Sequence, residues 1–253
     1  MKVTSSPTQL KSIAGPLAAL TGLGGPIDLP PRDGARLQTV YDDEARLMRL
    51  MRDGRAEPLW YDWVPQRSLS VSVREARRLG GTPVLASFTD EAVAVRGTGG
   101  TAVPQGPGTI NISVLSRHPR HPGIGEAYAG LCDALRKGFA ALGMETTLGA
   151  RQGSFCDGDH NILSEGRKLV GTAQRWALAR DGSAVCLHHC VILSGGAPET
   201  LCARTEALYA HAGQEVRYDR DAHSSQALDR AALARAMDKP LRDYIVRAGE
   251  DRL

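Results

Sequence analysis

Two short turns divide residues 161–193 into three runs that are typical of β-strands. The turns lie at Glu165-Gly166 and Asp181-Gly182, and the two longer runs are RKLVGTAQRWALA and AVCLHHCVIL. An Asp-Gly pair between two such runs is a strong signal for a β-hairpin. The segment therefore predicts consecutive antiparallel strands, and it constrains the fold more than any other stretch of the chain.

The remaining elements mix strands and helices without a regular alternation. In the first helix, Asp42 or Asp43 is expected to cap the start and Gly54 to end the helix. Period-two patterns predict strands at 68–73, 91–96 and 109–115, and helical patterns predict helices from 41 to 54, at 125–142, 198–211 and 228–247.

This order of elements favours an α+β fold, sandwich-like in build, in which a mixed, largely antiparallel sheet is flanked by helices. We expect a single domain over residues 37–253. Residues 1–36 are rich in Pro, Gly and Ser and predict an N-terminal extended arm.

Charge and composition argue against several classes of partner. The 31 basic and 28 acidic side chains give a formal net charge of +3, no five-residue stretch is dominated by Lys and Arg, and aromatic residues make up only 5%. These values do not favour nucleic acid binding. Five cysteines without a repeating spacing do not suggest a disulfide framework, and no apolar run approaches the length of a membrane span. We expect a cytoplasmic protein with no membrane partner.

A glycine-rich turn at 97–108 separates two of the predicted strands. Glycines permit positive φ and let backbone N–H groups approach a ligand closely. The turn lacks the Lys-Ser/Thr ending of a P-loop and the glycine spacing of a dinucleotide fingerprint. It is therefore either a plain connection or a ligand-binding turn of another kind.

Taken together, four segments resemble the lipoate–protein ligase and octanoyltransferase family, which carries the biotin/lipoate A/B protein ligase catalytic domain. The turn is similar to that family's Arg-Arg-x-x-Gly-Gly-Gly-Ala-Val-x-His-x-x-Gly-x-Leu-Asn segment, and GRKLVGTAQ places Lys168 on its functional lysine. LHHCVIL resembles its His-His-Gly strand, and DDEARL the start of its first helix. The matching turn positions are Arg96, Gly99, Gly100, Ala102, Val103, Gly108 and Asn111, and the chain departs from the pattern at Val95, Thr101, Gln105 and Cys190.

The resemblance implies a fold like that of class II aminoacyl-tRNA synthetases and biotin protein ligases, with an acyl tunnel in a mixed sheet. About 60 residues follow residue 193 in this chain of 253. The resemblance implies a longer C-terminal segment for the ATP-dependent ligases, which carry an accessory domain there. The short segment therefore favours the transferase branch of the family. The residues that the resemblance implies for substrate binding are Arg96, Thr98, Gly99, Gly100, Thr101, Asn111, Gly171, Thr172, Ala173, His188 and His189.

Cys156 and Lys168 are the candidate catalytic pair. Some octanoyltransferases of this family carry a cysteine at this place before the lysine strand. A thiol with an ordinary pKa of ~8.5 is mostly protonated at neutral pH, and a neighbouring lysine favours the thiolate that acts as nucleophile. The polar, turn-like setting FCDGD favours this role for Cys156 over that of a small buried residue, which stays the alternative.

We therefore expect an acyltransferase that moves an octanoyl or lipoyl group from a thioester or protein donor to a specific lysine of a lipoyl domain, through an acyl group on Cys156. The expected partners are acyl carrier protein and lipoyl-domain proteins such as 2-oxoacid dehydrogenase E2 and the glycine cleavage H protein. Lipoate or octanoate is the cargo, and no further cofactor is required.

Two other hypotheses stay open. An ATP-dependent lipoate ligase would use ATP and Mg²⁺ to form lipoyl-AMP, Lys168 would contact that adenylate, and Cys156 would be incidental. The departures at Val95 and Gln105 suggest instead a non-catalytic acyl-binding or regulatory domain on the same scaffold.

A metal site at Cys186, His188, His189 and Cys190 is a further hypothesis. Residues 186, 188 and 190 share one face of a predicted strand, and together they would span roughly 13 Å at ~3.3 Å per residue. This span is too long for one tetrahedral ion. No metal is expected there.

Overall fold

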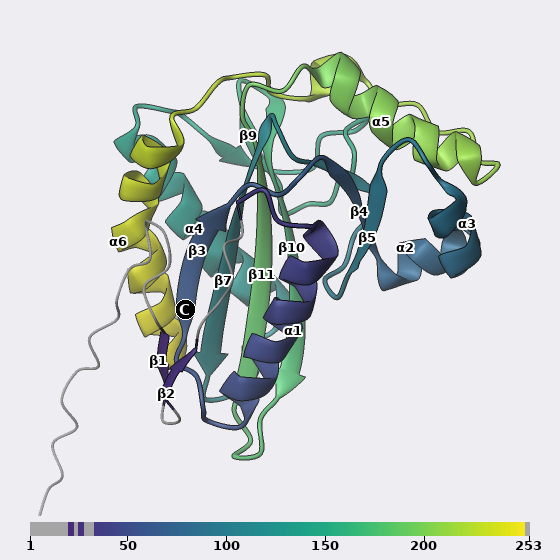
Figure 1. Ribbon diagram of the computed structural model, residues 1–253. Coiled ribbons are helices and arrows are strands. Elements are labelled where there is room, and N and C mark those ends of the chain that lie inside the picture. The colour runs from purple at the N-terminus through teal and green to yellow at the C-terminus, as the bar shows by residue number, and fades with distance from the viewer. Residues whose placement is uncertain (1–19, 23–24, 28–32, 251–253) are drawn as a thin grey trace, which may run out of the picture.

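A six-stranded antiparallel sheet forms the centre of the structure, a computed structural model that describes residues 20–22, 25–27 and 33–250 (Figure 1). Every pair of neighbouring strands in this sheet is antiparallel. In order across the sheet, the strands are β3 (Leu59–Trp63), β7 (Thr109–His118), β11 (Ala184–Leu193), β10 (Arg167–Leu178), β9 (Ile162–Ser164) and β8 (Thr147–Leu148).

Both predicted hairpins are present. Glu165 and Gly166 join β9 to β10 with φ values of 52° and 72°, and positive φ at both central residues is typical of the two-residue turns that match strand twist. Asp181 and Gly182 join β10 to β11, with Gly182 at a φ of 84°. The prediction of consecutive antiparallel strands is therefore confirmed.

A smaller three-stranded sheet contains the parallel pair of the fold. β4 (Ser68–Ser72) pairs in parallel with β5 (Ala92–Arg96) and antiparallel with β6 (Val103–Gln105). Parallel strands need a long crossover connection, which here consists of α2 (Val73–Arg78) and α3 (Gly81–Ser87). The sequence patterns did not predict β6, α2 or α3. The mixed, largely antiparallel α+β class is confirmed.

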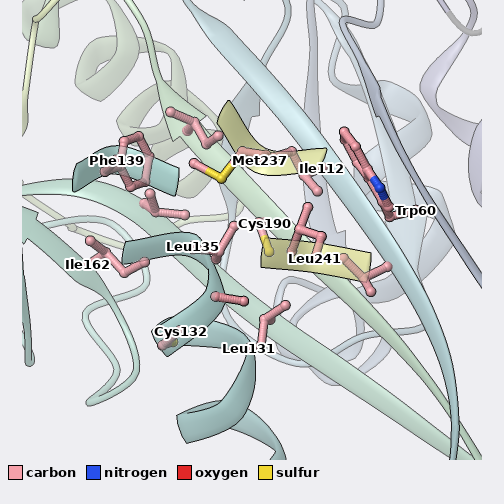
Figure 2. Packing of buried hydrophobic residues seen from close by; sticks show 14 of the residues in the cluster. Trp60, Ile112, Leu131, Cys132, Leu135, Phe139, Ile162, Cys190, Met237 and Leu241 are labelled. Atoms are coloured by element: carbon pink, nitrogen blue, oxygen red, sulfur yellow. The ribbon is translucent and has the colours of Figure 1, made fainter. Parts of the chain in front are cut away.

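Two helices cover one face of the central sheet. α4 (Ile124–Ala141) and α6 (Arg230–Gly249) lie side by side on it (Figure 1). Phe139 from α4, Met237 from α6 and Cys190 from β11 meet in this layer and are fully buried (Figure 2). A methyl group on Gly138 would lie 2.3 Å from Sδ of Met237, so this glycine lets the two helices approach closely.

α1 (Leu37–Arg52) lies against the opposite face, where Leu47 and Met51 pack with residues of β3, β7 and β11. The predicted start of this helix is wrong. It begins at Leu37 without a side-chain cap, and Asp42 and Asp43 lie inside it. The helix extends further because its first turns are buried against the sheet, and tertiary packing outweighs a local capping signal. Gly54, at a φ of 68°, follows the last turn as expected.

The remaining elements complete the second layer around the small sheet. Leu208 and Tyr209 of α5 (Pro198–His211) pack on Leu69 and Val71 of β4, and the short helix η1 (Arg220–Ala222) follows α5. β1 (Leu20–Gly22) and β2 (Gly25–Ile27) form a hairpin inside the predicted arm 1–36, most of which lies outside the described residues. None of the described helices is long and apolar enough to cross a membrane.

Candidate active site

A cavity lies between the face of the central sheet that carries α1 and the small sheet. Gln105 Oε1 and Asn111 Nδ2 are buried at its wall and have no hydrogen-bond partner among the residues that the structure describes, so they are available to a ligand. The lining residues are Tyr41, Trp63, Ser70, Arg96, Val103, Gln105, Asn111, Phe155, Cys156, Lys168, Gly171, Thr172, Ala173, His189, Val191 and Leu193.

Lys168 is a buried amine in the wall of the cavity. It stands at the start of β10, where the pairing register with β9 shifts before Val170, and its side chain is 1% exposed. Its Nζ donates hydrogen bonds of 2.6 Å to the carbonyl oxygens of Phe155 and Cys156. Burial lowers the pKa of Lys168 to about 8, although the nearby Cys156 and Asp157 oppose the shift. Close to neutral pH this amine can therefore both hold and release a proton.

Cys156 is partly exposed and faces the same cavity. Its backbone has a φ of 54°, a region that residues other than glycine rarely adopt. A methyl group on Gly100 would lie 2.6 Å from its Sγ, so the thiol packs directly against the glycine-rich turn. Cys156 and Lys168, the predicted pair, thus line the same cavity, with Lys168 Nζ bonded to the Cys156 carbonyl oxygen.

Arg96 shapes the turn. Its Nε and both terminal nitrogens donate to the carbonyl oxygens of Gly99, Thr101 and Ser70 and to the hydroxyl of Ser70. A guanidinium has five N–H donors, and these five bonds occupy all of them. Arg96 therefore lines the cavity but has no free donor for a phosphate or carboxylate, and Gly99 and Thr101 act through their carbonyl groups.

His189 belongs to a buried polar network at the other end of the cavity wall. Its Nε2 lies 2.6 Å from Oε2 of Glu44, and its Nδ1 lies 3.0 Å from Oγ1 of Thr98. The other oxygen of Glu44 accepts bonds of 2.6 Å from Tyr61 and Ser113. Thr98 thus lies behind His189, where it fixes the ring without lining the cavity.

His188 lies on the opposite face of the sheet. Its Nε2 is 2.8 Å from the hydroxyl of Tyr244 on α6, and burial lowers the pKa of His188 to about 3. Cys186 and Cys190 share that face, and burial raises the pKa of both thiols. Of the two histidines expected to bind substrate, only His189 reaches the cavity. In the part of the chain that the structure describes, no three His, Cys, Asp or Glu side chains are grouped to hold a metal ion.

The sequence model of the lipoyl protein ligase A/B catalytic domain matches residues 44–214, which is more than half of the chain. The chain belongs to this family. The resemblance read from the glycine-rich turn, the lysine strand and the His-His strand is therefore confirmed. All of the predicted site residues, from Arg96 to His189, fall inside the matched segment.

Relatives in this family include octanoyltransferases. An octanoyl-[GcvH]:protein N-octanoyltransferase of Kyrpidia tusciae is 36% identical over 151 residues, which are 58% of this chain and 51% of that protein. An uncharacterized protein of Cupriavidus necator is 32% identical over 192 residues, 70% of this chain and 75% of that protein. The chain spans about half the length of the Kyrpidia octanoyltransferase.

Solved structures of the family share the fold. A lipoate protein ligase from T. acidophilum with bound lipoic acid superimposes with a TM-score of 0.59 over 86% of this chain and 87% of its own, at 14% identity. A lipoate-protein ligase A bound with ATP gives a TM-score of 0.58 over 86% of each chain, at 16% identity. At these identities the likeness establishes the fold alone, which this chain shares with the two lipoate ligases.

Several residues of the site were not predicted, among them Glu44, although it stands within the DDEARL motif. Tyr41, Trp63 and Phe155 line the cavity, and Tyr41 stacks on His189 at 5.4 Å between ring centres. Glu44 holds His189 from behind. Its signal was present in the sequence, because Glu44 is an acidic residue inside the otherwise apolar stripe of α1, and a buried carboxylate needs partners.

Proposed function

We propose that this chain is an octanoyl or lipoyl transferase in which Cys156 carries the acyl group between a donor and the lysine amine of an acceptor domain. One observation carries the proposal. Cys156 lines a cavity together with Lys168, a buried lysine of lowered pKa that donates to the Cys156 carbonyl oxygen. The octanoyltransferases among the relatives support the same assignment.

The first step forms the acyl-enzyme. The thiolate of Cys156 attacks the carbonyl carbon of the donor, so that a C–S bond forms and the bond from that carbon to the donor's sulfur or lysine nitrogen breaks. A thioester donor releases a thiol, and an octanoyl-lysine donor releases an amine that must gain a proton. Lys168 is placed to supply that proton, because its ammonium has three donors and only two are used on carbonyl groups.

The second step transfers the acyl group to the acceptor. A neutral lysine amine of the acceptor attacks the thioester, the C–N bond forms, and the C–S bond to Cys156 breaks. The attacking nitrogen loses a proton, which neutral Lys168 can accept, since its pKa of about 8 leaves a substantial neutral fraction at mildly alkaline pH. Both steps exchange one acyl bond for another, and neither needs ATP.

The relatives support the cargo and the partners that we propose. Their name describes transfer of octanoyl from the glycine cleavage H protein to another protein. We assign octanoyl or lipoyl as the cargo, the octanoylated H protein or octanoyl-acyl carrier protein as the donor, and lipoyl domains such as those of 2-oxoacid dehydrogenase E2 as the acceptor. Apolar side chains such as Val191 and Leu193 provide the wall that an eight-carbon chain requires.

Intact mass spectrometry tests the proposal directly. The protein is mixed with octanoylated H protein or octanoyl-acyl carrier protein, without ATP, and sampled over time. We expect one octanoyl adduct that hydroxylamine removes, that is absent in Cys156→Ser, and that passes to a lipoyl domain added later. Cys186→Ser is the matched control, because Cys186 lies on the packed face 3.7 Å from Gln174 Oε1, which a serine hydroxyl can also reach.

The same experiment separates the two other hypotheses. Modification of a lipoyl domain that requires ATP and free lipoate, and that survives in Cys156→Ser, would identify a ligase. The five N–H donors of Arg96 are already bonded to the protein, so this side chain offers none to a phosphate of ATP. Thermal stabilisation by octanoate without an adduct or any transfer would identify a non-catalytic acyl-binding domain.

A further inference from the structure

The backbone on either side of Cys156 is held by hydrogen bonds to three consecutive peptide groups. Lys168 Nζ donates to the carbonyl oxygens of Phe155 and Cys156 at 2.6 Å, and Asn161 Nδ2 donates to the Cys156 carbonyl at 3.2 Å. On the other side, the backbone N–H of Phe155 donates to Nε2 of His223 at 3.1 Å. The left-handed backbone of Cys156 is unfavourable by itself and persists where such surroundings impose it.

His223 is fixed in place by the chain around it. It follows η1, is 1% exposed, and its ring stacks on Phe155 with 4.2 Å between ring centres. The backbone N–H of the next residue, Ser224, donates to the carbonyl oxygen of Lys168 at 2.8 Å. The segment that carries His223 is thus attached to the same strand end as the catalytic lysine.

The hydrogen bonds of His223 indicate which nitrogen of its neutral imidazole carries the proton. Because Nε2 accepts the Phe155 N–H, the proton of the neutral ring belongs on Nδ1, which lies 3.6 Å from Sγ of Cys202. Burial and the nearby Lys168 favour the neutral form and lower the pKa of His223 to about 4. The ring can therefore remain an acceptor throughout the neutral range.

His223 also lies outside the part of the chain that defines the family. The match to the catalytic domain ends at residue 214, and His223 comes from the segment between α5 and α6. The loop around Cys156 rests on this segment at a second place, where the N–H of Asp219 donates to the carbonyl of Gly153 at 2.9 Å.

We infer that His223 is a positioning residue for the nucleophile. By accepting the N–H of Phe155 it fixes the Ser154–Phe155 peptide, one residue before Cys156, and so helps to direct Sγ toward Gly100 and the cavity. The inference rests on the proposed role of Cys156 as the acyl carrier. It assigns His223 no contact with the substrate and no proton transfer.

Two amide substitutions separate positioning from simple packing. In His223→Gln the side-chain carbonyl can occupy the place of Nε2 and accept the Phe155 N–H, whereas in His223→Asn the shorter side chain places its carbonyl nearer to Nδ1. We expect the rate constant of Cys156 acylation to fall about 100-fold in His223→Asn, because the Cys156 thiol is then no longer held in the orientation for attack. His223→Gln should stay close to wild type, and donor affinity should be unchanged in both. His211→Leu, which removes an exposed histidine of α5, is the control.

Hydrogen exchange at the Phe155 amide tests the bond without any acyl transfer. We expect this amide to be protected in the wild type and in His223→Gln and to exchange much faster in His223→Asn. Rapid exchange in the wild type, or equal acylation rates in the two folded variants, would overturn the inference. If His223→Asn does not fold, the wild-type exchange and the rate of His223→Gln decide. A wild-type protein that is never acylated, but whose Phe155 amide is protected, would refute the proposed function and leave the bond to His223 in place.

Discussion

The two faces of the central sheet differ at a single step along β11, between His188 and His189. His188 faces α4 and α6, where it bonds Tyr244 and burial lowers its pKa to about 3. His189 faces the cavity and bonds Glu44 and Thr98. Successive side chains of a strand point to opposite sides of the sheet, so one dipeptide reports on both environments.

The two faces of the central sheet therefore have different roles, one in stability and one in activity. The face that carries α4 and α6 is filled by apolar side chains such as Phe139 and Met237 (Figure 2), and close packing of this kind supplies most of a domain's stability. The cavity face leaves space and polar groups next to Cys156. Substitutions on the first face should therefore change stability, and those on the second should change activity.

The largest effect is expected for Phe139→Ala on the packed face. Removal of a fully buried phenylalanine leaves a cavity and costs about 3–5 kcal/mol of the free energy of unfolding. Urea unfolding measures this loss. The fraction of folded variant that is acylated at Cys156 should equal that of the wild type. A folded variant with normal stability, or one with selectively lost acylation, would contradict the separation of the two faces.

Gly100→Ala, next to Cys156, should reduce the rate of Cys156 acylation more than it reduces stability. The new methyl group would lie 2.6 Å from Sγ of Cys156 and 2.9 Å from Nη2 of Arg96, and Gly100 has a φ of 99° that alanine does not readily adopt. We expect the acylation rate to fall by about 100-fold or more, because the nucleophile is displaced. Gly99→Ala is the matched control, since nothing lies within 4 Å of its added methyl group. Equal rates in the two variants would show that the thiol does not depend on the turn.

The pH dependence of stability should report on the packed face. The pKa of His188 is about 3 in the folded protein and close to 6.5 in the unfolded chain, so the unfolded chain binds more protons between these values. The stabilisation is therefore complete above pH 6.5 and declines as the pH falls through that window. From pH 7 to pH 5 this one histidine should account for a loss of about 2 kcal/mol. His188→Gln should lose correspondingly less over the same range, as measured by urea unfolding at each pH.

Much of the fold could be predicted from the sequence, because the hairpins of the central sheet have turn residues that local chemistry dictates. Glu165-Gly166 and Asp181-Gly182 set the turns directly. β6 has three residues, too few for a period-two pattern, and the start of α1 depends on burial against the sheet. These features are decided by tertiary contacts that a local pattern does not contain.

The site was predictable to the extent that family motifs mark it. The motifs mark Lys168, Gly100 and His189, and the resemblance together with a polar setting marks Cys156. The roles of Glu44, which stands in the DDEARL motif, and of His223 were not predicted, because each acts through another residue: Glu44 through His189, and His223 through the backbone of Phe155. Such roles depend on residues far apart in the sequence, and only the folded arrangement shows them.

The smallest change in stability is expected for Val191→Ala, next to the packed Ile192. Val191 is partly buried and lines the cavity, so its truncation enlarges a space that already exists and should cost about 1 kcal/mol or less of the free energy of unfolding. Ile192→Ala, on the packed face, should cost about 2–5 kcal/mol.

The larger cavity of Val191→Ala should in turn shift the preferred length of the acyl chain. One methylene in an apolar pocket is worth about 1–3 kcal/mol, so decanoyl donors should gain on octanoyl donors by several-fold in Val191→Ala. Acylation rates for a series of chain lengths measure this shift. An unchanged preference would mean that the acyl chain does not run past Val191, and that the apolar part of the cavity near Leu193 or Trp63 receives it instead.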